Sequence, residues 1–204
     1  MCFHTKQSKD AVLVEKRFNA KIENINLFKP TTEINGFTYP KTPVISNAAR
    51  SVIKHFQWGL IPPWAKDDSI KAYTLNAKIE TIKEKPSFKN FVKNRCLIIV
   101  DGFYEWQWLD PKGKKKQKYL VTKPKEELFS LGGIWSEWTD KTTGEIIKSY
   151  SIVTTEANEL MAEIHNNKKR MPVILEPKEE ENWLKGEEIN DFRKCDVELK
   201  AVLQ

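Results

Sequence analysis

The strongest β-strand signal in the chain is RCLIIVDGFYEWQW, which runs from Arg95 to Trp108. Branched and aromatic residues dominate this stretch, and both kinds favour extended backbone. A turn sequence, Asp110-Pro111-Lys112-Gly113, follows it, and a lysine run then leads into Tyr119-Leu120-Val121. Two strand-like runs around a Pro/Gly turn predict a β-hairpin with a basic tip.

A second hairpin is predicted further along the chain. Leu128 to Trp138 and Ile146 to Thr154 are both strand-like, and Thr142-Thr143-Gly144 separates them. Upstream, Val52 to Trp58 predicts another strand. The stretch before it, up to about Ser51, is broken by several prolines and a glycine, so we expect packed loops there.

Helices are predicted between these strands. Apolar residues at helical spacing indicate a helix from about Asp10 to Lys21, with Ser8 as its cap. A short helix is expected from about Ser87 within the Thr81 to Asn94 stretch. Ala157 to His165 and Lys178 to Leu184 are also predicted to be helical.

Hairpins that alternate with helices predict an α+β fold rather than repeated parallel strand–helix units. The core is expected to be a curved, mainly antiparallel β-sheet or open barrel with peripheral helices. The chain has 204 residues, a length that suits one domain, so residues 1–204 are predicted to form a single domain.

The composition favours a soluble protein with an anionic partner. Hydrophobic residues make up 40% and charged residues 30%, which suits a globular core rather than a disordered chain. The net charge is +6, and a basic excess favours nucleic acid. The N-terminus lacks a secretory signal and no apolar run could span a membrane, so a cytoplasmic monomer without a membrane partner is expected.

The cysteines and histidines do not form a metal motif. The three cysteines are Cys2, Cys96 and Cys195, and neither they nor the histidines have the spacing of metal ligands. An odd number of cysteines argues against a disulfide framework. We therefore expect no metal and no cofactor.

Cys2 can carry unusual chemistry if Met1 is removed. The residue would then offer an α-amine with a pKa of about 7.7–8.0 and a thiol with a pKa of about 8.5. An aldehyde can condense with the amine to a Schiff base, and the thiol can close a five-membered thiazolidine ring. Taken by itself, however, a cysteine at position two is more often incidental.

Three further residues are candidates for a role in catalysis. Glu105 lies among aromatic residues, where desolvation favours the protonated form, and such a group can act as a general acid or base. His165 follows an apolar helical stretch and can move protons, although it can equally be a helix cap. Asn76 can hold a substrate or satisfy a turn.

Several short motifs together resemble the SRAP family, the SOS response-associated peptidases that process abasic sites. They begin with Met1-Cys2 and span most of the chain in the family's order. The others are the Pro40 loop, Trp58 to Trp64, Asn76 to Thr81, Asp101 to Trp106, and Ile164-His165 with Arg170-Met171-Pro172.

The resemblance implies a function and a set of site residues. It implies a protein of the DNA-damage response that binds single-stranded DNA and crosslinks covalently to the aldehyde of an abasic site. Cys2 resembles the family's nucleophile, and the other implied catalytic residues are Asn76, Glu105 and His165. The implied DNA-binding residues are His4, Pro40, Lys78, Trp106 and Arg170.

The chain departs from the family pattern near its start and after His165. Phe3-His4 stands where the family has Gly-Arg, and Lys78 stands where it usually has an arginine. The loop after His165 is extended by Asn166 to Lys169, which adds positive charge. The tail after Asp191 looks shorter than usual, so its last strands are expected to be absent or different.

Slow lyase activity through the Schiff base and autoproteolytic N-terminal processing, a hydrolase reaction, are compatible with the resemblance. Two other functions stay open at this stage: a thiol-dependent peptidase, and a non-catalytic module that binds nucleic acid.

Overall fold

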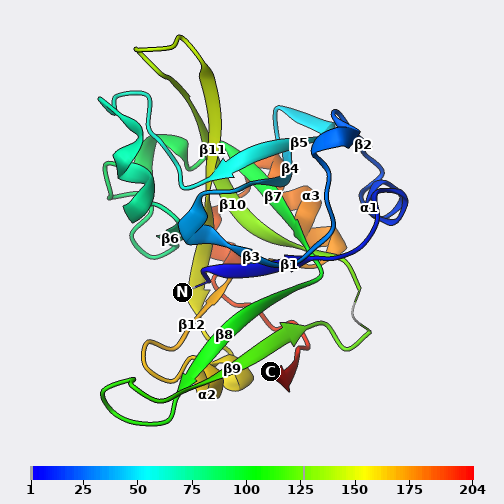
Figure 1. Ribbon diagram of the computed structural model, residues 1–204, viewed down its shortest axis with the longest axis vertical. Coiled ribbons are helices and arrows are strands. Elements are labelled where there is room, and N and C mark those ends of the chain that lie inside the picture. Colours follow the sequence, from blue (N-terminus) through cyan, green and yellow to red (C-terminus); the bar gives the residue numbers. More distant parts are fainter. Residues whose placement is uncertain (1, 126) are drawn as a thin grey trace.

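The computed structural model describes residues 2–125 and 127–204. Two sheets form the body of the molecule, and one of them curls into a barrel (Figure 1). The smaller sheet has the strand order β14-β9-β8-β1-β3. Its strands are β1 (His4–Gln7), β3 (Thr31–Asn35), β8 (Gly102–Trp108), β9 (Lys116–Thr122) and β14 (Lys200–Leu203).

The larger sheet has the order β12-β11-β10-β7-β4-β5-β2, with β13 beside β10 and β6 beside β11. Its strands are β2 (Lys21–Ile22), β4 (Lys41–Ser46), β5 (Ala49–Trp58), β6 (Asn76–Lys78), β7 (Arg95–Val100), β10 (Phe129–Thr139), β11 (Ile146–Glu156), β12 (Arg170–Pro172) and β13 (Ile174–Leu175). β11 also pairs in parallel with β5, through Tyr150 and Trp58, so five strands close into a barrel.

The α-helices of the described residues lie around these sheets: α1 (Ala11–Phe18), α2 (Glu159–Ile164) and α3 (Pro177–Lys185). Short 3₁₀ turns in the same residues connect other segments: η1 (Ile25–Leu27), η2 (Gly36–Thr38), η3 (Asp68–Tyr73), η4 (Lys89–Phe91) and η5 (Ile189–Phe192). Figure 1 shows α1 at the edge of the molecule and α2 beside the β8–β9 hairpin. The predicted α+β fold with a curved, mainly antiparallel core and peripheral helices is confirmed.

The stretch Arg95–Trp108 forms two strands in different sheets rather than one. The chain bends at Asp101, whose buried carboxylate accepts hydrogen bonds from Lys6 Nζ (2.8 Å) and from the Ser8 backbone N–H and hydroxyl (2.7 Å each). These contacts hold the end of β1 against the bend. β7 therefore enters the barrel, whereas β8 joins β1 and β9 in the smaller sheet.

Two local predictions were wrong for identifiable reasons. Ser8 does not cap the first helix, because its side chain binds Asp101; the side chain of Asp10 accepts the hydrogen bond from Leu13 N instead. That helix ends at Phe18, where Asn19 adopts a left-handed conformation.

The proline-rich stretch before Ser51 contains β3, β4 and the start of β5, not loops alone. Pro43 is tolerated in β4 because the pairing of β4 with β7 begins only at Val44, so the missing N–H of Pro43 leaves no gap on that side.

The other predicted elements differ in extent. Both hairpins are present, as β8–β9 and β10–β11, and the helices near Ala157 and Lys178 are α2 and α3. The helix expected from Ser87 is only the 3₁₀ turn η4. The tail does supply a last strand, β14, which pairs with β9. No helix in residues 2–125 or 127–204 is long and apolar enough to cross a membrane.

Candidate functional site

The start of the chain is built into the core next to the barrel. Cys2 is fully buried and packs in the same apolar cluster as Trp58 and Phe103. Gly36 donates its N–H to the Phe3 carbonyl (2.8 Å), and a Cβ at Gly36 would come within 3.1 Å of both that oxygen and the Trp58 ring. The glycine therefore lets the N-terminal segment lie close against Trp58.

Asn76 fixes the backbone at Cys2. It stands at the start of β6, where it pairs with Ile152 of β11, and its Nδ2 donates to the Cys2 carbonyl oxygen over 2.9 Å. Its buried Oδ1 has no hydrogen-bond partner among the described residues. A buried acceptor in this position can bind a donor group of an incoming ligand.

Glu105 and His165 line one pocket of about 190 Å³ next to the N-terminal segment. We call it the N-terminal pocket. Its lining residues are Phe3, Glu105, Trp106, Trp108, Lys116, His165, Asn167 and Lys168. Strand β8 supplies the glutamate and both tryptophans, β9 supplies Lys116, and the end of α2 supplies His165 and the residues after it. Segments that are far apart in the sequence thus form a single cavity.

Burial changes the protonation of both candidate acid–base residues. Glu105 is only 4% exposed, and desolvation raises the pKa of its carboxyl to about 7. His165 is also buried, and desolvation lowers the pKa of its imidazole to about 4. At neutral pH Glu105 is therefore divided between its acid and base forms, whereas His165 is neutral.

The backbone of Arg170 positions the imidazole of His165. The Nδ1 atom lies 2.8 Å from the Arg170 carbonyl oxygen and 3.1 Å from the Arg170 nitrogen. Nδ1 donates to the carbonyl in one tautomer and accepts from the Arg170 N–H in the other. In the first tautomer Nε2 carries the lone pair of the neutral ring and can accept a proton.

The thiol of Cys2 is held in its protonated form. Burial raises its pKa above the ordinary range, and the negative charge of the nearby Glu105 raises it further. The Sγ atom points toward the His4 carbonyl oxygen at 3.9 Å. A cysteine that acts as a free thiolate nucleophile has the opposite environment, with a lowered pKa.

Phe3 and His4, which follow Cys2, both have defined contacts. Phe3 packs against the exposed ring of Phe37, with ring centroids 4.7 Å apart. His4 binds Glu33 through Nδ1 (2.9 Å), and its ring meets that of Trp106 edge-on at 4.8 Å. His4 thus supports Trp106, which itself lines the N-terminal pocket.

The other residues predicted to bind DNA do not line this pocket. Lys78 is exposed at the end of β6, and Pro40 accepts a backbone hydrogen bond from Trp58 (2.9 Å). Arg170 is buried and makes two bonds to the Glu80 carboxylate (2.7 and 2.9 Å) and one to the Thr154 carbonyl (2.7 Å). Its guanidinium therefore joins β12 to β11, and its contact with DNA stays a prediction.

Five lining residues did not emerge from the sequence as candidates: Phe3, Trp108, Lys116, Asn167 and Lys168. Strand alternation places Trp106 and Trp108 on one face, and the hairpin register pairs Trp108 with Lys116. The turn at Asp110–Gly113 was the signal that could have given this register. No group of three or more His, Cys, Asp or Glu residues in the described part of the chain could hold a metal.

Comparisons with known proteins identify relatives over most of the chain. Residues 1–201 match the family described as SOS response associated peptidase (SRAP). The abasic site processing protein YoqW of Bacillus subtilis is 39% identical over 168 residues, which cover 79% of this chain and 72% of YoqW. The abasic site processing protein HMCES of Gallus gallus is 30% identical over 71% of this chain and 48% of its own length.

A solved structure agrees with the fold over nearly its full length. The crystal structure of a protein from Bacteroides thetaiotaomicron superimposes with a TM-score of 0.90 and 34% sequence identity. The match covers 99% of this chain and 91% of the other. A protein from Bordetella bronchiseptica has the same fold, with a TM-score of 0.80 and 23% identity over 100% of this chain and 99% of its own.

Proposed function

Because the chain belongs to the SOS response associated peptidase (SRAP) family, we propose that it processes abasic sites by capturing them in single-stranded DNA through a covalent bond to Cys2. The observation that carries this proposal is the meeting of Glu105 and His165 in one pocket beside the N-terminal segment, whose backbone Asn76 holds. The pocket offers acid–base groups where the α-amine of a processed Cys2 is needed.

The proposed reaction begins with removal of Met1, which lies outside the described residues. This hydrolysis gives Cys2 a free α-amine. The amine adds to the C1′ aldehyde of the ring-opened deoxyribose, and loss of water gives a Schiff base. The Cys2 sulfur then bonds to C1′, its proton passes to the nitrogen, and a thiazolidine ring results.

Each polar residue has a distinct part in this proposal. Glu105, with a pKa near 7, takes a proton from the amine and returns it to the hydroxyl that leaves as water. Neutral His165, in the tautomer with the proton on Nδ1, takes the proton of the C1′ hydroxyl through Nε2 and returns it to O4′ as the C1′–O4′ bond breaks, which opens the deoxyribose ring. Asn76 positions Cys2 and offers its Oδ1 to the amine or to a sugar hydroxyl.

The state of Cys2 favours this order of steps over a thiol-dependent peptidase. A peptidase needs a thiolate that attacks first, whereas burial keeps this thiol protonated. In the proposed reaction the amine attacks first, and the thiol closes the ring only on an adjacent, electrophilic carbon. Cleavage of the strand from the Schiff base is a side reaction in the same scheme.

The test uses single-stranded oligonucleotides that differ only at one sugar. One carries an abasic site, one carries the same site reduced to the alcohol, and one has an intact base. The untagged protein should form a band that survives denaturation with the first oligonucleotide alone. A similar yield with the reduced site would exclude the aldehyde as the reacting group and refute the proposal.

A further inference from the structure

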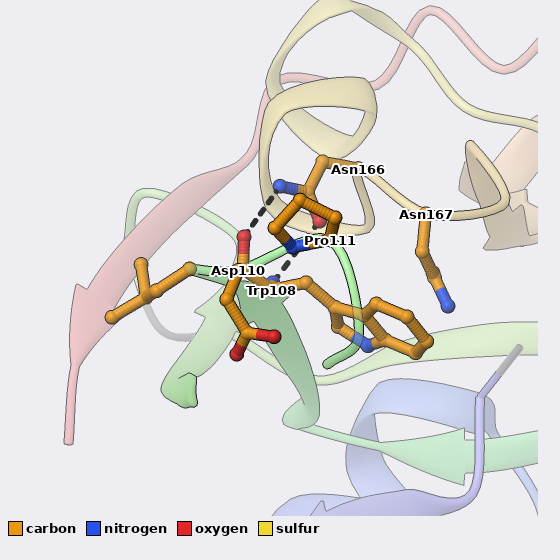
Figure 2. A pocket seen from close by; sticks show the side chains of 6 residues that line it. Trp108, Asp110, Pro111, Asn166 and Asn167 are labelled. Atoms are coloured by element: carbon orange, nitrogen blue, oxygen red, sulfur yellow. Dashed lines mark hydrogen bonds between the residues drawn. The ribbon is translucent and has the colours of Figure 1, made fainter. Parts of the chain in front are cut away.

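The loop after α2 makes hydrogen bonds to the edge of strand β8 beyond Tyr104. β1 pairs with β8 only as far as Tyr104, so the edge of β8 beyond that residue needs other partners. The side-chain amide of Asn166 supplies them: Oδ1 accepts from Trp108 N (3.0 Å), and Nδ2 donates to Trp108 O (2.9 Å). Figure 2 shows these two bonds side by side. Gln107 adds a bond to the Glu163 carbonyl (3.1 Å).

These contacts border a second pocket of about 440 Å³, which lies next to the N-terminal pocket. Its lining residues are Trp108, Leu109, Asp110, Pro111, Asn166 and Asn167. Trp108 and Asn167 line both pockets, so the two cavities are neighbours. In Figure 2 the Asn167 side chain extends toward the ring of Trp108.

The hairpin holds the indole of Trp108 as a fixed aromatic surface. Gly113 adopts a positive φ of 63°, and a Cβ there would approach the Trp108 ring to 2.6 Å. Lys116 Nζ lies 5.4 Å from the ring centroid. The turn at Gly113 thus packs against the ring, and the cation of Lys116, which also lines the N-terminal pocket, lies over it.

We propose that this second pocket binds the nucleobase next to the abasic nucleotide, stacked on Trp108 and contacted by the Asn167 amide. This inference rests on the proposed capture of abasic DNA in the N-terminal pocket. Bases stack on aromatic side chains in single-stranded DNA complexes regardless of sequence. Lys116 and Lys168, which line the N-terminal pocket, are placed to meet the phosphate between the two nucleotides.

The charges of the two pockets favour a base, not a phosphate, in the second one. Among the described residues that line it, Asp110 alone is charged, and its carboxylate, which accepts backbone hydrogen bonds from Lys112 and Lys115, repels phosphate. The lysines line the first pocket instead. A DNA strand whose abasic sugar lies beside Glu105 therefore has lysines next to its phosphates. Its neighbouring base meets the second pocket, which offers the Trp108 ring and the Asn167 amide.

The test measures binding separately from crosslinking. Three single-stranded oligonucleotides carry a tetrahydrofuran abasic analogue, which has no aldehyde. The first has normal bases on both sides, and the others have a second tetrahydrofuran at the 5′ or the 3′ neighbour. With the parent protein, loss of one of the two neighbouring bases should raise the Kd by roughly 5- to 150-fold, the range of a stacked base.

Substitutions assign this effect to the second pocket. In Trp108→Ala the same base removal should change the Kd by less than about twofold, because the stacking surface is gone. Tyr73→Ala removes an aromatic residue that is 86% exposed and lines neither pocket, so it should keep the full effect. If Trp108→Ala does not fold, Trp108→Phe should retain the effect and Asn167→Ala should reduce it.

The outcomes separate this inference from the proposed function. A parent protein that crosslinks to aldehyde-bearing DNA but binds all three analogues equally would overturn the second pocket alone. Persistence of the neighbour effect in Trp108→Ala would overturn it as well. A parent protein that neither binds nor crosslinks abasic DNA would overturn both proposals.

Discussion

At the scale of single residues, the candidate site combines three side chains whose ionisation is shifted by burial. The Cys2 thiol and the Glu105 carboxyl have raised pKa values, and the His165 imidazole has a lowered one. All three shifts favour the uncharged form. Near pH 7 the site therefore holds a neutral thiol, a neutral imidazole and a carboxyl divided between its acid and base forms, which suits the exchange of protons with an amine and a sugar.

Replacement of Glu105 by glutamine should slow crosslinking about 10²- to 10⁴-fold, because the amide keeps the shape but cannot exchange protons. The pH profile should change too. In the parent, the carboxylate fraction rises as the pH passes through about 7, so the rate should rise there. Glu105→Gln should lose this inflection and keep only that of the amine. Parental rates from a folded Glu105→Gln protein would make Glu105 a structural residue.

The same substitution should stabilise the protein at alkaline pH. A carboxyl whose pKa rises on folding, here from 4.5 to about 7, contributes stability below the lower value and loses it as the pH rises through the upper one. The full cost above pH 7 is roughly 3 kcal/mol. Glu105→Gln should therefore melt above the parent at pH 8, with a smaller advantage at pH 5. Equal melting differences at both values would contradict the raised pKa.

At the scale of elements, the hairpin β8–β9 and the end of α2 build the site between them. The Asn166 amide replaces a missing strand along the edge of β8 and keeps Trp108 in place. His165, one residue earlier, is positioned by its contacts with the Arg170 backbone. The extended loop after His165 thus has a structural role in addition to its positive charge.

Asn166→Ala should loosen this junction without unfolding the barrel. Two exposed hydrogen bonds are lost, each worth about 0.5–1.5 kcal/mol at most. Hydrogen exchange at the Trp108 amide should accelerate, whereas amides in β7 should keep their protection. Asn167→Ala is the matched control, because no hydrogen bond of Asn167 holds the hairpin among the described residues. Unchanged exchange at Trp108 in Asn166→Ala would show that this contact is not needed.

The elements also show which parts of the fold the sequence could predict. Both hairpins were predicted correctly, because alternating strands and a Pro/Gly or Thr-Gly turn are local features. The break at Asp101 was missed, since it depends on bonds from Lys6 and Ser8, which are distant in the sequence. The strand β4 was missed because Pro43 is acceptable only where one side of its strand is unpaired.

The site, like the fold, could be predicted only where the signal is local in the sequence. Cys2, Glu105 and His165 could be named from residue chemistry and ordered motifs, but the meeting of Glu105 and His165 in one pocket beside the N-terminal segment depends on tertiary contacts. The second pocket could not be predicted, because it depends on the Asn166 contact with Trp108 across the fold.

At the scale of the whole molecule, both the charge and the topology suit the proposed binding of DNA at the N-terminal pocket. The net charge is +6, and lysines flank the N-terminal pocket where the DNA backbone is expected. The barrel and the smaller sheet meet at the bend between β7 and β8, beside the N-terminal segment. Cys2, the proposed reacting residue, thus stands on a rigid support rather than on a loose terminus.

Binding to single-stranded DNA should depend strongly on salt and weakly on sequence. Contacts with phosphates release counterions, so the affinity should fall steeply between roughly 50 and 200 mM salt. Fluorescence anisotropy with oligonucleotides of different sequence measures both effects. A flat response to salt, or a strong preference for one duplex sequence, would contradict a backbone-dominated interface.

The most direct test of the central claim compares two changes at the N-terminus. The claim is that one residue, Cys2, supplies both an α-amine and a thiol. Cys2→Ala keeps the amine and removes the thiol, whereas an uncleaved tag keeps the thiol and converts the amine to an amide. Both proteins are incubated with the same abasic oligonucleotide as the untagged parent, after mass spectrometry has confirmed the loss of Met1 from the parent and from Cys2→Ala.

The account predicts that the stable adduct disappears in both variants, while Cys2→Ala retains reversible DNA binding and some strand cleavage. A tagged protein that crosslinks as well as the parent would contradict the thiazolidine mechanism, because only a simple thiol nucleophile tolerates a blocked amine.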